Sequence, residues 1–270
     1  MASDTTKTHP WHLVEPSPWP ILAAVSAAVM AVGLIVFMHE DSPWLLILGL
    51  VLVMGVFTGW LRDVVAEAQG GIFHSELVQK GLRLGFVLFI VSEVMFFFAF
   101  FWAYFHSSLP ILNNVAGTWP NGDLEAIGAG GIPMLNTLIL LSSSVTVTIA
   151  HHAIIENDRP KAVRWTGITV LLGVIFLGFQ ITEYGHAYHD GLKLTSGIYG
   201  STFYLLTGFH GFHVTVGVIM LTVILYRIQK GHFDSDNHFA FEGVAWYWHF
   251  VDVVWIFIFT VIYLVPNPTS

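Results

Sequence analysis

The sequence predicts an all-α membrane protein of seven transmembrane helices, with the N-terminus inside and the C-terminus outside. Hydrophobic residues make up 55% of the 270 residues and charged residues only 10%, and the mean hydropathy is +0.70. A water-exposed surface does not have this composition. Seven apolar stretches reach the roughly 20 residues that a helix needs to cross a membrane. Their unbroken apolar character disfavours a membrane β-barrel, whose strands alternate.

The predicted helices follow one another along the chain. The N-terminal residues have neither an Arg-rich amphipathic pattern nor a signal-peptide layout, so the first apolar run is expected to remain as a span. The third helix carries the aromatic string VMFFFAFFWAYF. The sixth is too long to stand perpendicular in an average bilayer and is expected to tilt or project inward. The helices are expected at residues 20–38, 44–61, 81–105, 132–154, 165–182, 198–226 and 243–265.

These helices divide the chain into five expected parts. They are an inner N-terminal segment (1–19), a two-helix bundle (20–61), an inner linker (62–80), a five-helix bundle (81–265) and an outer tail (266–270). The loops are short except residues 107–131, which contain Gly, Asn and Pro and are expected to form a structured outer cap.

The positive charges support this topology. With the N-terminus inside, nine of the ten Lys and Arg residues lie on the inner side and only Lys193 lies outside. An inner excess of Lys and Arg is the pattern that sets membrane orientation. The nine inner residues are Lys7, Arg62, Lys80, Arg83, Arg159, Lys161, Arg164, Arg227 and Lys230.

Composition also excludes several kinds of function. The net charge of −8 comes from loops and not from a basic surface, which argues against nucleic-acid binding. The sequence contains no cysteine, which excludes disulfides, thiolate metal sites and a cysteine nucleophile. Any metal would therefore have to be bound by histidine and carboxylate.

Five ionisable residues fall near the middle of predicted helices. Such a side chain costs several kcal/mol in hydrocarbon unless it is buried in protein or paired. Glu93 lies about 12 residues, or roughly 18 Å, into the third helix. His210 with His213, and His249 with Asp252, are pairs at i,i+3 spacing, so each pair shares a helix face. One inward cluster of all five is geometrically possible.

Three interpretations of these residues stay open. They could pack helices together through hydrogen bonds, bind a metal or a haem, or form a proton or ion path. Against a di-iron site, the chain has a single Glu-x-x-His string, from Glu183 to His186, and not the two that such bundles use. Against a path, the third helix offers no second carboxylate to continue a relay.

Small and polar residues predict helix contacts. Gly55 with Gly59, and Gly81 with Gly85, have the spacing that allows close helix approach. The fourth helix carries hydroxyl residues that we expect to hydrogen-bond to neighbouring helices. These are Ser142, Ser143, Ser144, Thr146 and Thr148.

Four strings closely resemble subunit III of the haem-copper cytochrome c oxidases. They are SEVMFFFAFFWAYFHSSL from Ser92, AHHAI from Ala150, IYGSTFYLLTGFHGFHV from Ile198 and WYWHFVDVVW from Trp246. The resemblance runs from about Trp11 to Tyr263. It implies that the first two helices are separated from the other five by a cleft filled with phospholipid. It also implies that this chain carries no haem, copper or other metal.

The resemblance further implies partners and a role. Subunit I would hold the haems and the oxygen-reducing site, and subunit II would receive electrons from cytochrome c. The present chain would bind structural phospholipids, stabilise subunit I, support proton uptake and protect the oxygen-reducing centre. It would thus be part of a proton-pumping oxidase without catalysing redox chemistry itself.

The resemblance assigns roles to particular residues. Glu93 matches a carbodiimide-reactive glutamate of the family. Arg227 matches a lipid-phosphate contact, and Trp60, Arg62 and Glu93 are also expected at the lipid. His9 and His12 fall where the family places a proton-uptake surface. We expect Glu93 to be a neutral carboxyl that faces the cleft or a packing partner.

Alternatives remain at this point. The chain could be subunit III of a quinol-oxidising relative, an independent transporter, or a redox protein with its own haem or metal. A transporter often has repeated halves and broken helices, which this sequence lacks. We expect the bacterial inner membrane as its location, with the mitochondrial inner membrane as the alternative.

Overall fold

The computed structural model describes residues 16–69, 75–109, 119–120 and 126–265. This part of the chain forms seven helices that are long and apolar enough to cross a membrane, and it contains no strand. The predicted all-α fold with seven spans is therefore confirmed, whereas the predicted orientation stays a prediction. The helices are α1 (Trp19–Glu40), α2 (Trp44–Gln69), α3 (Glu76–Ser108), α5 (Ile132–Ile155), α6 (Arg159–His189), α7 (Ile198–Lys230) and α8 (Phe239–Ile258).

Several helices extend beyond the predicted spans. Helix α2 continues past residue 61 to Gln69, and α6 runs from Arg159 to His189 instead of 165–182. The start of α6 is fixed by Asp158, whose side chain accepts a hydrogen bond from the Lys161 backbone N–H, and by a proline in the first turn. Helix α8 ends in a π-helical segment, η1 (Phe259–Leu264). The polar residues at the ends of α2 and α6 are typical of loops, but in the structure they continue the helices.

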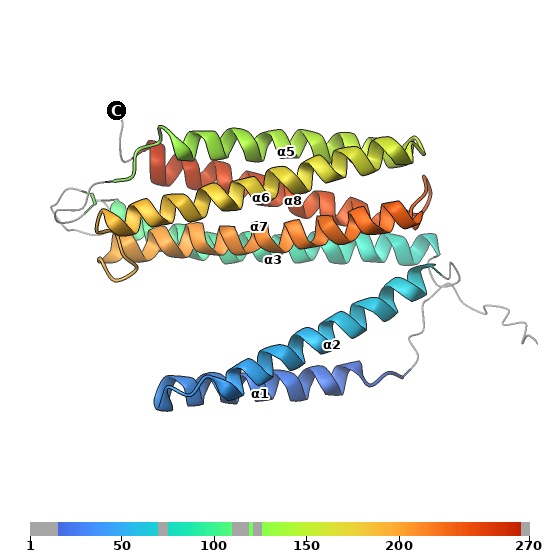
Figure 1. Cartoon of the computed structure of the whole chain (residues 1–270), viewed down its shortest axis with the longest axis horizontal. Helices are drawn as coiled ribbons and strands as arrows, with labels where there is room; N and C mark the ends of the chain where they lie inside the picture. The colour runs from blue at the N-terminus through green and yellow to red at the C-terminus, as the bar shows by residue number, and fades with distance from the viewer. Residues whose placement is uncertain (1–15, 70–74, 110–118, 121–125, 266–270) are drawn as a thin grey trace, which may run out of the picture. The chain divides into compact units, whose positions relative to one another are not determined.

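The structure has two compact units, residues Met1–Leu82 and Arg83–Ser270. In the first unit, α1 and α2 form an antiparallel hairpin (Figure 1). Their backbones meet at Gly33 and Gly49: a Cβ on Gly33 would lie 2.5 Å from the Leu46 backbone nitrogen, and one on Gly49 would collide with the Met30 backbone. At the other end of the hairpin, Trp19 Nε1 donates to Asp63 at 2.7 Å.

The predicted glycine contacts are mostly wrong. Gly59 does meet a neighbour, the Trp19 ring, but Gly55, Gly81 and Gly85 have no atom of the described residues near the position of a Cβ. Two glycines four residues apart therefore do not by themselves show that a helix face contacts another helix.

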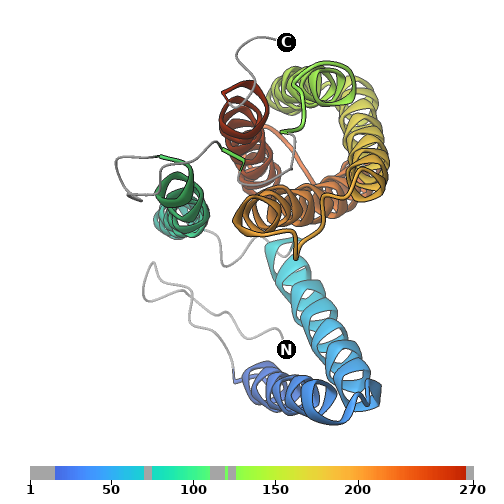
Figure 2. The same cartoon turned by 90° about the vertical axis from the view of Figure 1, so that its left-hand side faces the viewer.

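In the second unit, four helices close a ring. Helix α5 packs on α6, α6 on α7, α7 on α8, and α8 back on α5, as the end view shows (Figure 2). Helix α3 joins through aromatic side chains. Phe96 meets Phe209 of α7 with ring centroids 5.1 Å apart, and Phe97 meets Phe250 of α8 at 6.0 Å. Within the phenylalanine-rich string, Phe97 and Tyr104 are therefore buried against the ring, whereas Met95, Phe98 and Trp102 are exposed.

Trp248 of α8 lies fully buried at the centre of the ring. A Cβ on Gly173 of α6 would be 2.8 Å from its Cη2 atom, and one on Gly217 of α7 would be 2.7 Å from its Cε3 atom. Its Nε1 donates to Ser143 Oγ of α5 at 2.9 Å. A single side chain thus joins all four helices, and the two glycines leave the space that its indole occupies.

Candidate functional site

The polar groups at membrane depth form the candidate site, and the first contact joins Glu93 of α3 to His213 of α7. His213 Nε2 lies 2.9 Å from Glu93 Oε2, and His213 Nδ1 lies 2.6 Å from the Phe209 carbonyl oxygen. The carbonyl can only accept, so Nδ1 carries a proton. His213 is 5% exposed, and Glu93 is half-buried.

One proton must therefore lie between Nε2 and Oε2. Either the carboxylic acid donates to a neutral imidazole, or an imidazolium donates to a carboxylate. In both cases the pair has no net charge. A neutral pair is the form that a membrane interior tolerates best. The geometry agrees with the expectation that Glu93 meets a packing partner, and that partner is His213.

His210 makes a separate set of contacts. Its Nε2 donates to the Val251 carbonyl oxygen of α8 at 3.2 Å, and its ring centroid lies 4.9 Å from that of Trp255. Trp255 Nε1 in turn donates to Thr137 Oγ1 of α5 at 2.9 Å. His210 is 1% exposed and packs against the rings of Phe176 and Trp255.

His249 and Asp252 of α8 face α5 and not Glu93. His249 Nδ1 lies 2.6 Å from Ser144 Oγ, and Nε2 lies 3.3 Å from Thr148 Oγ1. The Thr148 hydroxyl donates to the Ser144 carbonyl oxygen at 3.0 Å, so the Nε2–H of His249 donates to Thr148 and the Ser144 hydroxyl donates to Nδ1. Asp252 Oδ2 is 4.0 Å from His249 Nδ1. Neither Asp252 carboxyl oxygen has a hydrogen bond within the described residues.

Ser144, His249 and Asp252 do not form a nucleophilic triad. In a catalytic triad the serine hydroxyl is hydrogen-bonded to one ring nitrogen of the histidine, and the aspartate is hydrogen-bonded to the other. Here both Ser144 and Asp252 approach Nδ1. The histidine therefore has no means of moving a proton from the serine toward the carboxylate.

Most hydroxyls of α5 join helices as predicted. Ser143 accepts from Trp248, Ser144 and Thr148 contact His249, and Thr146 Oγ1 lies 2.8 Å from Thr169 Oγ1 of α6. Ser142 is the exception, because it is exposed and donates to the Leu138 carbonyl oxygen of its own helix. The expectation of an interhelical bond was wrong for that residue.

The structure thus separates the five mid-membrane residues into three sets of contacts. Glu93 pairs with His213, His210 bonds to a backbone carbonyl, and His249 with Asp252 lies against α5. Within the described ranges, no three His, Asp or Glu side chains are placed to bind one metal ion. Proton transfer along a continuous chain would need contacts between these sets.

The other predicted residues lie elsewhere. Arg227, near the end of α7, is 9% exposed, and its guanidinium lies 4.6 Å from the centroid of the Phe233 ring. Trp60 and Arg62 are exposed on α2. Their lipid contacts stay a prediction. His9 and His12 lie outside the described residues.

Sequence reasoning missed a buried network around Glu183. Glu183 of α6 is 4% exposed, and its Oε1 accepts hydrogen bonds from the Tyr263 hydroxyl of η1 and from Gln180 Nε2. Its Oε2 has no hydrogen bond within the described part of the chain. The predicted fifth span ends at residue 182, one residue before Glu183, whereas α6 continues to His189 and buries Glu183.

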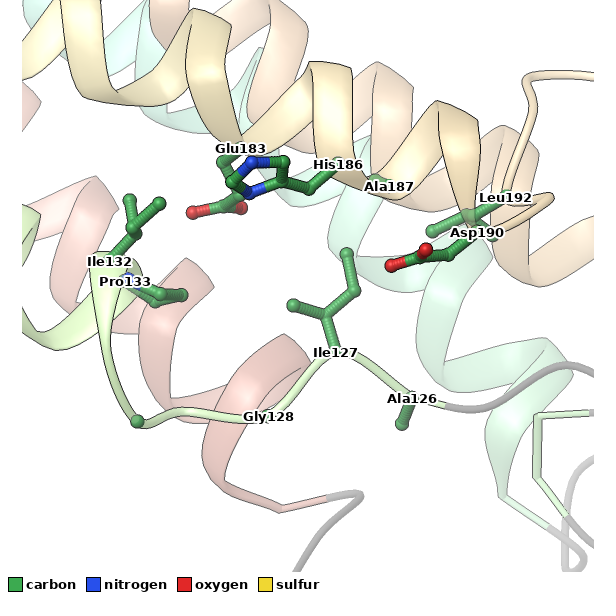
Figure 3. A pocket seen from close by; sticks show the side chains of 11 residues that line it. Ala126, Ile127, Gly128, Ile132, Pro133, Glu183, His186, Ala187, Asp190 and Leu192 are labelled. Carbon is green, nitrogen blue, oxygen red and sulfur yellow. The ribbon is translucent and has the colours of Figure 1, made fainter.

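Glu183 also lines a pocket of about 580 Å³. The wall includes the loop at Ile127 and Gly128, the start of α5 and the end of α6 (Figure 3). Figure 3 shows the carboxyl of Glu183 directed toward Ile132, with His186 and Asp190 following on the same helix. His186 and Asp190 are exposed, so the pocket is polar where α6 ends.

Together, these features define a multi-pass α-helical membrane protein in which Glu93, His213, His210 and His249 are hydrogen-bonded to residues of other helices. A family model described as cytochrome c oxidase subunit III matches residues 9–266. The chain belongs to this family, whose members are parts of the cytochrome c oxidase complex of the respiratory chain. The family lacks metal centres of its own.

Similar proteins come from animals and plants. A cytochrome c oxidase subunit 3 from Branchiostoma lanceolatum is 50% identical over 255 residues, which cover 94% of this chain and 96% of the relative. The subunit 3 from Arabidopsis thaliana is 49% identical over 260 residues, covering 96% and 97%. The subunit 3 from Danio rerio is 46% identical over 257 residues, covering 95% and 97%.

Proposed function

We propose that this chain is the cofactor-free third subunit of a proton-pumping cytochrome c oxidase. In this role it packs against subunit I, which holds the haem and copper of the oxygen-reducing site, while subunit II receives electrons from cytochrome c. It stabilises subunit I, supports proton uptake and protects the oxygen-reducing centre during turnover.

The Glu93–His213 pair carries this proposal. Glu93 of α3 and His213 of α7 are hydrogen-bonded to each other at mid-membrane depth, and the pair has no net charge. Both groups are therefore used to hold two helices together. The same holds for His210, whose donor is bound to a backbone carbonyl. These contacts favour a structural subunit over an independent transporter or redox protein.

Phospholipid binding is part of the proposal. Arg227 is a largely buried cation, and its Nε has no hydrogen bond within the described residues. A guanidinium in this position suits a phosphate oxygen. Glu93, Trp60 and Arg62 would also contact lipid, and His9 and His12 would belong to the proton-uptake surface. The protein is an integral multi-pass membrane protein; the bacterial inner membrane stays a prediction.

Removal of the subunit tests the proposal. The oxidase without this chain is expected to start at a near-normal rate and then to lose activity after fewer turnovers than the complete enzyme. The number of turnovers before inactivation, measured by oxygen consumption at saturating cytochrome c, is the quantity to compare. Adding back the purified chain serves as the control. An equal number of turnovers with and without the chain would contradict the protective role.

A further inference from the structure

We propose that the pocket at the end of α6 binds a primary ammonium group carried on a short apolar chain, with the Glu183 carboxylate as its counter-ion. This Glu183 pocket is formed by residues within 126–133 and within 183–192. The inference goes beyond the proposed function and does not depend on it, because the described wall belongs entirely to this chain.

The buried carboxylate of Glu183 is the first observation. Glu183 is 4% exposed, and both the Tyr263 hydroxyl and Gln180 Nε2 donate to its Oε1 atom. Two donors on one oxygen suit an ionised carboxylate, which can only accept. Its Oε2 atom has no partner within the described residues, and Figure 3 shows the carboxyl directed across the pocket toward Ile132. A buried charged oxygen without a donor is costly, so Oε2 needs a donor from a ligand.

The neighbouring Gln180 has the same requirement. Gln180 is 4% exposed and lies three residues before Glu183 on α6. Its Nε2 is used in the bond to Glu183, whereas its Oε1 has no hydrogen bond within the described part of the chain. Two adjacent side chains therefore each leave an acceptor without a donor. An ammonium group offers three N–H donors together with a positive charge.

The chain does not supply this cation from the described residues. Among them, no Lys or Arg lines the pocket. Lys193 is close in sequence, but its Nζ lies 5.1 Å from the centroid of the exposed Tyr188 ring, which is not part of the described wall. Asp190 adds a second carboxyl group at the rim, where His189 Nδ1 lies 3.8 Å from its Oδ1. His186 is the basic member of the described wall, so the acidic groups outnumber it.

The size and the apolar part of the wall favour an organic amine over a metal ion. The volume of about 580 Å³ falls within the roughly 300–1,000 Å³ of small-molecule sites. Ile127, Ile132, Pro133 and Ala187 also line the pocket and would surround an alkyl chain. In the ranges that the structure describes, no three His, Asp or Glu side chains are placed to hold one metal ion. The pocket therefore suits a charged amine on an apolar chain.

Binding of hexylamine tests the inference. The full-length chain is reconstituted in nanodiscs of phosphatidylcholine, and binding of tritiated hexylamine is measured by scintillation proximity. We expect saturable binding to the native chain. Glu183→Gln keeps an acceptor for the Tyr263 hydroxyl but loses the charge, and it is expected to weaken binding about ten-fold or more. Glu40→Gln removes an exposed carboxylate at the end of α1 and is expected to leave binding unchanged.

Competing ligands on the native chain identify the chemistry without any substitution. Hexanol has the same chain without the charge, and hexyltrimethylammonium has the charge without N–H donors. Ethylamine has the ammonium group without most of the chain. Each is expected to compete about ten-fold or more weakly than hexylamine. Nanodiscs that contain phosphatidylethanolamine distinguish the source of the ammonium group: weaker hexylamine binding there assigns the site to lipid headgroups, and unchanged binding assigns it to soluble amines.

Three results would overturn the inference. The first is the absence of saturable hexylamine binding to the native chain, which would leave a pocket filled only by water. The second is equal affinity of the native chain and the Glu183→Gln variant. The third is competition by hexanol as strong as that by hexylamine. The unfolding temperature of Glu183→Gln is measured alongside, and the competition series stays decisive if this variant does not fold.

Discussion

Replacing Gly217 with leucine is expected to destroy the packing of the four-helix ring. A Cβ at this position would lie 2.7 Å and 2.8 Å from two ring atoms of Trp248, and Trp248 cannot move aside because Gly173 of α6 lies against its indole. Inserting extra carbons into a packed core costs roughly 1–3 kcal/mol or more. For a leucine against an immobile indole we expect the upper end of this range or beyond.

Gly211→Leu is the matched control for this variant. Gly211 is on the same helix, and no described atom lies within 4 Å of where its Cβ would be. Both variants gain the same helix propensity, so their difference isolates the contact with Trp248. The measurement is thermal unfolding of the purified chain in detergent. If Gly217→Leu and Gly211→Leu unfold at the same temperature, Trp248 does not organise the ring.

Replacing Glu183 with leucine is expected to give the second-largest loss of stability. Leucine would leave the Tyr263 hydroxyl and Gln180 without their acceptor, and both residues are buried. Each unpaired buried group costs about 1–3 kcal/mol. We therefore expect a loss of about 2–4 kcal/mol in the free energy of unfolding.

Glu183→Gln is the control, because its side-chain carbonyl can still accept from Tyr263. It is expected to lose less than about 1 kcal/mol relative to the native chain. Denaturant or thermal unfolding of the two variants in detergent distinguishes them. A leucine variant as stable as the glutamine variant would show that the hydrogen bonds of Glu183 contribute nothing to the fold.

The sequence was sufficient to predict the helices because a membrane imposes one strong requirement. Every span must be predominantly apolar over about 20 residues, so seven runs of sufficient hydropathy indicate seven helices. The ends of the helices were harder to predict. Hydropathy does not mark where a helix ends, since polar residues beyond the apolar run can continue it. Helix α6 extends seven residues past 182, to His189.

The depth of the ionisable residues was predictable, but their partners were not. Residue counting placed Glu93, His210, His213, His249 and Asp252 near mid-membrane, and i,i+3 spacing allowed one cluster. The structure puts His213 toward α3 and His249 toward α5, because which neighbour a helix face meets depends on tertiary packing. No sequence pattern specified that Glu93 would pair with His213.

Tertiary contacts also explain the glycines. The four-residue spacing predicts contacts at Gly55, Gly59, Gly81 and Gly85, yet apart from Gly59 the close approaches between helices occur elsewhere, at Gly33, Gly49, Gly173 and Gly217. Two of these glycines accommodate one tryptophan ring on another helix. A pattern within one helix carries no information about the side chain that will lie against it.

The central claim is that the ionisable groups inside the membrane hold helices together and do not carry protons for the pump. Glu93→Gln tests it most directly, because the glutamine amide can still donate to His213 Nε2 while it can no longer release a proton. The measurement is the number of protons pumped per electron by the assembled oxidase in vesicles. We expect the native ratio and a native rate of electron transfer. A loss of pumping, with the subunit still bound, would contradict the account.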